Sequence, residues 1–201
     1  MWELNDDLII EKEVFKGSTI YKIDNFYKNP EKIENHLFHD DVPLHKIHEK
    51  PSYNNIHFED RRSNYYDAGL THVVDFLSSI CNQRPLSYNV ITNQARLKKH
   101  NFNDYEKNYW WPHRDVGYNG IVYFNDDDGT NFYEEIITKK KYNEHFKPWR
   151  PKEDLRVVKK IKSKYNRLVF FNGRKFLHGM DINSDRYFCN EYRKNQVFFF
   201  Q

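Results

Sequence analysis

From residue 86 onward, the sequence consists of short runs in which apolar and polar residues alternate, the two-residue period of a β-strand. The pattern predicts strands at residues 88–97, 120–124, 130–137, 167–171, 174–178 and 190–200. Asn172 and Gly173 separate two of these runs, and an Asn-Gly pair in that position indicates a tight β-hairpin. Strands of this kind must bury one face against another layer, which restricts the chain to packed sheets.

The first 85 residues have a mixed pattern. Alternation at 8–10 and 19–24 predicts two short strands, and a helix is predicted to follow Asn29, a good N-cap with Pro30 in the first helical position. A second helix is predicted at 67–80, where apolar residues recur at helical spacing. Helices followed by antiparallel strands predict an α+β, mainly β chain whose sheets form a sandwich or barrel.

Composition supports one globular domain over residues 1–201. Aromatic residues make up 17% of the 201 residues, which excludes intrinsic disorder although 30% of the residues are charged. The longest apolar runs, such as 197–200, are far too short for a transmembrane helix. Residues 1–7 carry acids where a secretory signal carries bases, so we expect a cytoplasmic protein (in the host cytoplasm if it is viral) with no membrane partner.

The charge is balanced overall but not locally. A net charge of +3 is too small for an obligate nucleic-acid binder. Residues 134–166, however, hold eleven Lys or Arg against five Asp or Glu. We interpret this segment as a solvated basic insertion outside the core, in preference to a guide for an acidic peptide or a nucleic acid.

The two cysteines, Cys81 and Cys189, have neither the spacing of a zinc site nor the density of a disulfide framework. We expect two reduced thiols.

One His-x-Asp pair has the context of a metal site. Residues i and i+2 of a strand point to the same side, so His113 and Asp115 can aim at one point. Downstream, alternation places His178 on one face of the predicted strand at 174–178. Two histidines and one carboxylate leave three metal positions open, as in non-haem Fe(II) sites.

Two similar pairs are weaker candidates. His39 and Asp41 lie at the end of a predicted helix, where residues i and i+2 do not face each other. His57 and Glu59 lack a third ligand in a matching strand.

These motifs resemble those of the Fe(II)/2-oxoglutarate-dependent oxygenases, in the prolyl-4-hydroxylase-like branch of bacterial and phage proteins. The matching segments are residues 20–30, 112–115, 120–125, 129–133, His178 and 193–195. The resemblance implies a double-stranded β-helix (a jelly-roll, cupin-like core) at 86–201, with N-terminal strands and helices at 1–85 packed on one sheet.

The resemblance also implies the site. His113, Asp115 and His178 would bind Fe(II), while Arg193 and Asn195 would bind the far carboxylate of the cosubstrate 2-oxoglutarate with a hydrogen bond from Tyr123. Arginine suits this role because its planar donors match a carboxylate. Arg186 is the alternative to Arg193, because it stands closer to the usual distance after the second histidine; the strand pattern favours Arg193.

The implied reaction is O2-dependent hydroxylation of a substrate, coupled to decarboxylation of 2-oxoglutarate to succinate and CO2. A prolyl or other peptide residue is the branch's best-known substrate, but no residue of this sequence specifies it. Two other functions fit the sequence. A cupin-like metal enzyme without 2-oxoglutarate would not aim Arg193 at the metal. A non-enzymatic nucleic-acid-binding module would gather its aromatic residues and the bases of 139–164 on one exposed face.

Overall fold

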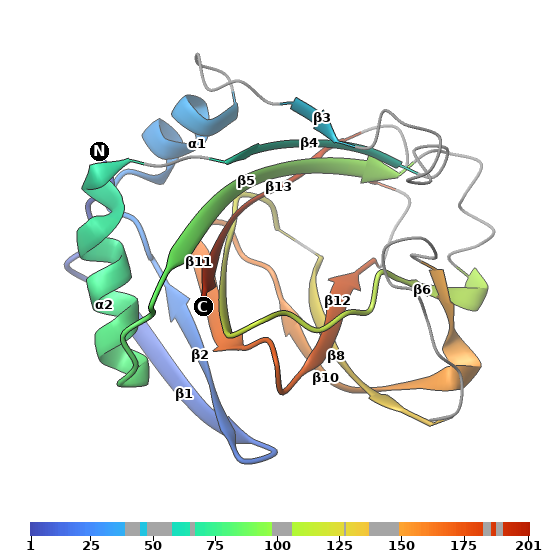
Figure 1. Ribbon diagram of the computed structural model, residues 1–201. Helices are drawn as coiled ribbons and strands as arrows, with labels where there is room; N and C mark the ends of the chain where they lie inside the picture. The colour runs from blue at the N-terminus through green and yellow to red at the C-terminus, as the bar shows by residue number, and fades with distance from the viewer. Residues whose placement is uncertain are drawn as a thin grey trace.

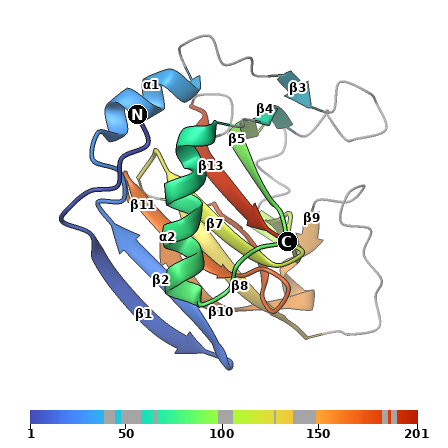
Figure 2. The ribbon, with the colours of Figure 1, turned by 60° about the vertical axis from the view of Figure 1, so that its left-hand side comes forward.

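The computed structural model in Figures 1 and 2 consists of two antiparallel sheets that face each other, with two helices on the outside. It describes residues 1–38, 45–47, 58–64, 67–97, 106–126, 128–136, 149–182, 186–187 and 191–201. The chain is thus mainly β, as the alternation predicts. The double-stranded β-helix itself stays a prediction.

The large sheet has eight strands in the order β1-β2-β11-β7-β13-β5-β4-β3, and all neighbours are antiparallel. Its strands are β1 (Ile9–Phe15), β2 (Ser18–Asp24), β3 (His45–Ile47), β4 (Phe58–Asn64), β5 (Tyr88–Leu97), β7 (Tyr118–Tyr123), β11 (Arg167–Asn172) and β13 (Arg193–Phe200). The two strands predicted near the N-terminus therefore form one edge of the main sheet.

The small sheet has the order β10-β8-β12, formed by β8 (Gly129–Glu135), β10 (Leu155–Lys162) and β12 (Leu177–Asp181). Two short strands, β6 (Asn108–Trp110) and β9 (Trp149–Pro151), pair separately, and a 3-10 turn, η4 (Lys152–Asp154), leads into β10. Gly129 begins β8 at a point where a Cβ would lie 1.9 Å from the carbonyl oxygen of Ile161. Only glycine fits there.

Strand alternation gives the large sheet two buried faces. The outer face packs on α1 (Pro30–Phe38) and on α2 (Thr71–Cys81), which follows the 3-10 turn η2 (Ala68–Leu70). The outer core includes Leu168, Phe170, Phe198, Ile33, Leu37, Val73 and Leu77. The inner core joins the two sheets and includes Tyr123, Val169, Phe171, Phe132, Ile161 and Phe176. Both predicted helices are confirmed.

The predicted Asn-Gly hairpin is wrong. β11 pairs with β2 and β7, whereas β12 pairs with β8, so the Asn172-Gly173 turn carries the chain from one sheet to the other. A tight hairpin turn of the Asn-Gly type needs positive φ at both central residues, and neither Asn172 nor Gly173 has it.

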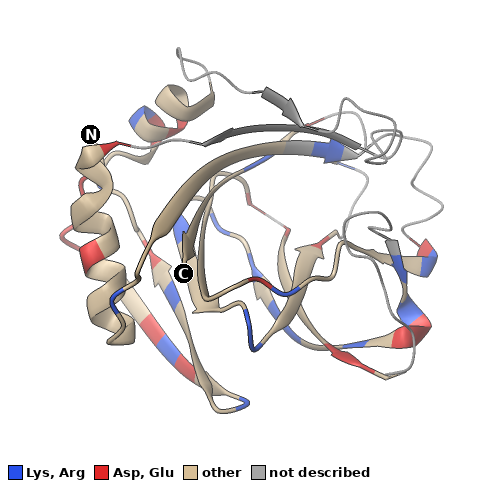
Figure 3. Cartoon of the chain, in the orientation of Figure 1, with Lys and Arg blue, Asp and Glu red and all other residues tan. Residues whose placement is uncertain are grey.

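The predicted insertion at 134–166 is also wrong over its described part. β10 completes the small sheet, and Leu155 and Ile161 are buried. In Figure 3, positions of Lys or Arg and of Asp or Glu are interspersed along the described part of this segment. The bases of this segment that pair with carboxylates are Arg150, Arg156, Lys159, Lys160 and Lys164.

No helix in the described ranges combines the length and the hydropathy that a membrane-spanning helix requires.

A two-pronged ion pair joins β2 to β11. Arg167 donates from Nε and Nη2 to the two carboxylate oxygens of Asp24, at 2.5 and 2.9 Å. Both side chains are largely buried, with exposed fractions of 13% and 12%. These hydrogen bonds from Arg167 hold the pKa of Asp24 below its usual value, although burial acts in the opposite direction.

Asp24→Asn is therefore expected to lower the free energy of unfolding by about 2 kcal/mol at neutral pH, the scale of a hydrogen bond to a charged group. Because the folded-state pKa is depressed, the stabilisation is fully present above the unfolded pKa of about 4 and is lost as the pH falls through the folded value. Urea unfolding of both proteins between pH 7 and pH 2 measures this. Asp6→Asn removes a carboxylate from an exposed pair with Lys28 and serves as the control. An equal loss at every pH would contradict the expectation.

Candidate metal centre

The backbone brings the three candidate ligands together. His113 and His178 form an isolated antiparallel bridge and exchange both backbone hydrogen bonds, at 2.8 and 2.9 Å. The backbone N–H of Asp115 then donates to the carbonyl of Gly173, at 3.1 Å, in the turn before β12. The His-x-Asp segment therefore runs beside the start of β12, and this placement sets the side chains against one another.

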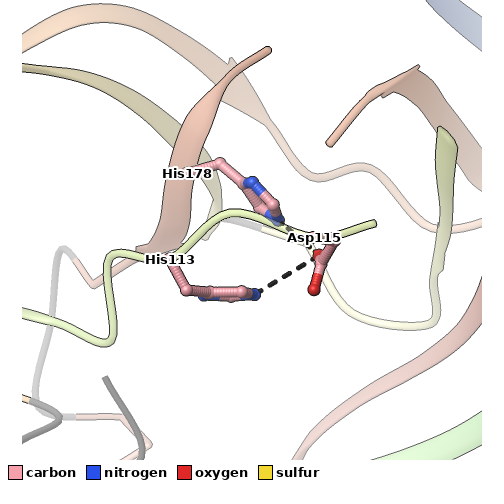
Figure 4. A group of neighbouring side chains, drawn as sticks. All are labelled: His113, Asp115 and His178. Atoms are coloured by element: carbon pink, nitrogen blue, oxygen red, sulfur yellow. Dashed lines mark ion pairs between the residues drawn. The ribbon is translucent and has the colours of Figure 1, made fainter. Parts of the chain in front are cut away.

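The side chains of His113, Asp115 and His178 point toward one another, as Figure 4 shows. The Nε2 atoms of His113 and His178 lie 3.5 and 3.2 Å from the same atom, Oδ2 of Asp115. One ligand atom from each residue lies within 4.8 Å of the other two, so the group could hold a metal ion.

Backbone carbonyls fix the orientation of both imidazoles. His113 Nδ1 lies 2.7 Å from the carbonyl oxygen of Trp111, and His178 Nδ1 lies 3.0 Å from that of Phe176. A carbonyl only accepts, so each Nδ1 carries a proton, and the Nε2 atom of each ring is the one that points toward Asp115. Such carbonyl contacts are typical of metal-binding histidines.

Trp111 adopts a strained backbone to supply its carbonyl. Its φ is +45°, in the left-handed region that bulky residues avoid. Strain of this kind persists where the surrounding structure imposes it, often at functional sites.

The protonation states suit metal binding. Burial lowers the pKa of His178, and the neighbouring His113 lowers it further, so the ring is neutral at pH 7. Burial alone would raise the pKa of Asp115, but the two imidazoles more than offset it and hold the pKa well below the usual value. An ionised oxygen therefore faces two imidazole nitrogens, an arrangement that a cation between them, whether a proton or a metal ion, stabilises. The donor set fits a divalent metal with two histidines and one carboxylate.

The site is enclosed on the His178 side and open on the His113 side. His178 packs edge-on against Phe171, with ring centroids 4.8 Å apart, and only 4% of its side chain is exposed. The side chain of His113 is 31% exposed. A ligand from solvent could approach from that side.

The predicted carboxylate-binding residues share the inner face of the large sheet. Asn195 on β13 is the register partner of Tyr123 on β7, and Arg193 lies two residues before Asn195 on the same face. The Arg193 guanidinium lies 5.5 Å from the Tyr123 ring centroid. The Tyr123 hydroxyl is 2.6 Å from Oγ1 of Thr130 on β8, which faces it from the small sheet.

Arg193 is a buried cation with no counter-ion in the part of the chain that the structure describes. It is 9% exposed, and its Nη2 donates to the carbonyl of Gly129 at 3.3 Å. Among the described residues, no carboxylate lies within ion-pair distance of it. Burying an unpaired charge is costly, so this position favours an anionic ligand. Asn195 Oδ1, also buried, has no hydrogen-bond partner in the described part of the chain.

Strand register relates this cation to the metal ligands. On β8, Phe132 is the register partner of His178, and Thr130 is the partner of Met180. Thr130 is thus displaced from Phe132 by two residues, about 7 Å, along the same face. The Tyr123–Thr130–Arg193 group and the three ligands therefore belong to one inner surface.

The other candidates have different surroundings. Arg186 donates from Nε to Glu191 at 2.6 Å in a partly exposed pair, so it already has a carboxylate partner. Trp110 is buried and packs against Trp111.

Three of the earlier candidates lie outside the residues that the structure describes: the His39 and Asp41 pair, the side-chain pair of His57 with Glu59, and Cys189. Cys81 is a free, half-buried thiol.

Sequence reasoning missed two polar residues, Thr130 and Asn119. Asn119 donates from Nδ2 to Asp115 Oδ2, the oxygen that faces both histidines. A signal was present, because β7 alternation puts Asn119 on the same face as Ile121 and Tyr123. A polar residue at an inward-facing position of an apolar strand needs a partner.

Comparison with known proteins gives only distant matches. No family model and no curated sequence matches the chain. One similar solved structure is an Fe(II)/α-ketoglutarate-dependent dioxygenase, TqaL, with 11% identity and a TM-score of 0.42 over 85% of this chain and 73% of that one. Another is a bsmA homologue from Methylobium petroleophilum PM1, with 10% identity and a TM-score of 0.36 over 98% of this chain and 77% of that one. Both scores lie below 0.5, so neither likeness establishes a shared fold.

Proposed function

We propose that this chain is an Fe(II)/2-oxoglutarate-dependent dioxygenase that hydroxylates a substrate and converts 2-oxoglutarate to succinate and CO2. One observation carries the proposal: the two-histidine, one-carboxylate cluster shares an inner surface with a buried arginine that has no carboxylate partner among the described residues. A metal site alone would fit many enzymes. The additional cation is what a dicarboxylate cosubstrate requires.

Different residues would bind the metal and the cosubstrate. His113, Asp115 and His178 would hold Fe(II), and the carbonyls of Trp111 and Phe176 keep the imidazole lone pairs aimed at it. Arg193 would bind the far carboxylate of 2-oxoglutarate, with Tyr123 donating a hydrogen bond and Asn195 beside them. Phe132 and Phe171 exclude water on the His178 side. When bound, Fe(II) with 2-oxoglutarate and O2 supplies the oxidising power for C–H hydroxylation.

The motifs favour the prolyl-4-hydroxylase-like branch, and a prolyl or other peptide residue is then the first substrate class to test. We expect the protein to act in the cytoplasm.

The two other functions have less support. A metal enzyme without 2-oxoglutarate has no use for a buried Arg193 on the surface that carries the ligands. A nucleic-acid-binding module would expose its aromatic residues, whereas most of the described ones are buried.

Anaerobic addition of Fe(II) and 2-oxoglutarate to the purified protein is expected to give a weak visible charge-transfer band. Admitting O2 should then release succinate, measured by mass spectrometry. Candidate peptides and nucleotides can be screened in the same assay for products 16 mass units heavier. Absence of both the band and succinate would refute the proposal. A band that forms with Fe(II) alone would favour a metal enzyme of another kind.

A further inference from the structure

Asn119 is the strongest unexplained polar residue of the site. It lies on β7, which supplies none of the predicted metal ligands, and it is 1% exposed. Its single side-chain hydrogen bond within the described part of the chain runs from Nδ2 to Asp115 Oδ2. Its Oδ1 is buried and has no hydrogen-bond partner among the residues that the structure describes. Within the described residues, the Asn119 side chain therefore makes its hydrogen bond to this carboxylate.

The amide of Asn119 donates through Nδ2, because its partner is a carboxylate oxygen. An ionised carboxylate only accepts, so the amide must turn Nδ2 toward it. An oxygen of a carboxylate has two lone pairs. Asn119 Nδ2 occupies one lone pair of Oδ2. The Nε2 atoms of His178 and His113 lie 3.2 and 3.5 Å from the same oxygen, so its other lone pair is on the side of the histidines.

Gly173 makes room for this contact. A Cβ on Gly173 would lie 2.9 Å from Asn119 Nδ2 and 3.0 Å from the Cβ of Asp115. The carbonyl of Gly173 also accepts the backbone N–H of Asp115. The φ of Gly173 is not positive, so alanine would suit the backbone there and would disturb only the packing of the two side chains.

We propose that Asn119 is a positioning residue for the metal, which fixes Asp115 as a ligand through one oxygen, and that Gly173 provides the space for it. A carboxylate that rotates can bind through both oxygens and occupies a further position on the metal. Holding it to one oxygen keeps three positions open for a cosubstrate and O2. This inference rests on the proposed metal site and extends it to β7.

Cobalt(II) tests the proposal without turnover, because its visible absorption reports both its affinity and its ligand geometry. Asn119→Leu removes the donor at similar size, and it is expected to weaken Co(II) binding about 10- to 100-fold, as loss of a group that orients a ligand does. The ligand-field band should change shape, because Asp115 is free to rotate. Gly173→Ala should weaken binding in the same direction while keeping every polar group.

Two controls separate positioning from folding. Asn89→Leu changes an exposed asparagine of the same sheet and should leave the Co(II) Kd unchanged. Thermal unfolding of the metal-free proteins reports any structural role of Asn119, since that role lowers Tm without altering the spectrum of bound Co(II).

The outcomes are distinct. Wild-type protein that binds neither Co(II) nor Fe(II) would overturn the proposed function and this inference together. Wild-type binding, with Asn119→Leu and Gly173→Ala both within threefold of its Kd and with its spectrum, would overturn the positioning role alone.

Discussion

Replacing Asp115 with asparagine is expected to abolish specific metal binding. Asp115 supplies the oxygen that both histidine Nε2 atoms face, and an amide is a neutral and much poorer ligand. Residues that merely orient ligands change metal affinity about 10- to 100-fold, so loss of the ligand itself should weaken Fe(II) or Co(II) binding by more than about 100-fold. Anaerobic titration followed by calorimetry measures the Kd.

Asparagine keeps the size of the side chain, so the fold should survive Asp115→Asn. Asp75→Asn, at an exposed position on α2, is the matched control and should bind metal as the wild type does. The Asp115→Asn variant should also lose the charge-transfer band, because 2-oxoglutarate then has no metal to chelate. If its Kd stays within threefold of the wild-type value, the metal is bound elsewhere.

Replacing Arg193 with methionine is expected to remove 2-oxoglutarate binding and to leave metal binding intact. Arg193 is the buried cation beside Tyr123, and breaking a buried charge pair costs about 3–5 kcal/mol, so the Kd for 2-oxoglutarate should rise by at least about 100-fold. Calorimetric titration with Mn(II)-loaded protein measures it without turnover.

The same variant tests the burial of an unpaired charge. Methionine relieves the desolvation of a guanidinium that has no carboxylate partner among the described residues, so the ligand-free protein should be as stable as the wild type or more stable. The wild type, in contrast, should gain Tm when saturated with 2-oxoglutarate. Arg186→Met is the control, since Arg186 already pairs with Glu191. Loss of 2-oxoglutarate binding in Arg186→Met alone would assign the cosubstrate to the other arginine.

Local pattern was sufficient for most individual elements. The strand predicted at 88–97 coincides with β5, and Pro30 begins α1 as its position after Asn29 predicts. These elements depend on alternation, capping and proline geometry within a few residues, which the sequence states directly.

Local pattern failed where one stretch of sequence suits two tertiary arrangements. The Asn172-Gly173 pair is typical of a hairpin, but β12 finds its partner in β8, across the inner core. The lysines of β10 suggested a solvated insertion, yet Leu155 and Ile161 provide the buried contacts that hold this strand on β8. Alternation gives the faces of a strand but does not identify its neighbour.

The sequence by itself indicated the types of most elements and the candidate ligands His113, Asp115 and His178, because residue chemistry and a two-residue period are local properties. The resemblance added Arg193, with Arg186 as the alternative. Only the tertiary structure decided that His178 lies against His113, that Arg193 is buried with no counter-ion among the described residues while Arg186 is paired, and that Asn119 reaches Asp115 from β7. The two contacts join the segment between β6 and β7 to β12 in the small sheet and to β7 in the large sheet, so they depend on how the two sheets pack and not on any local pattern.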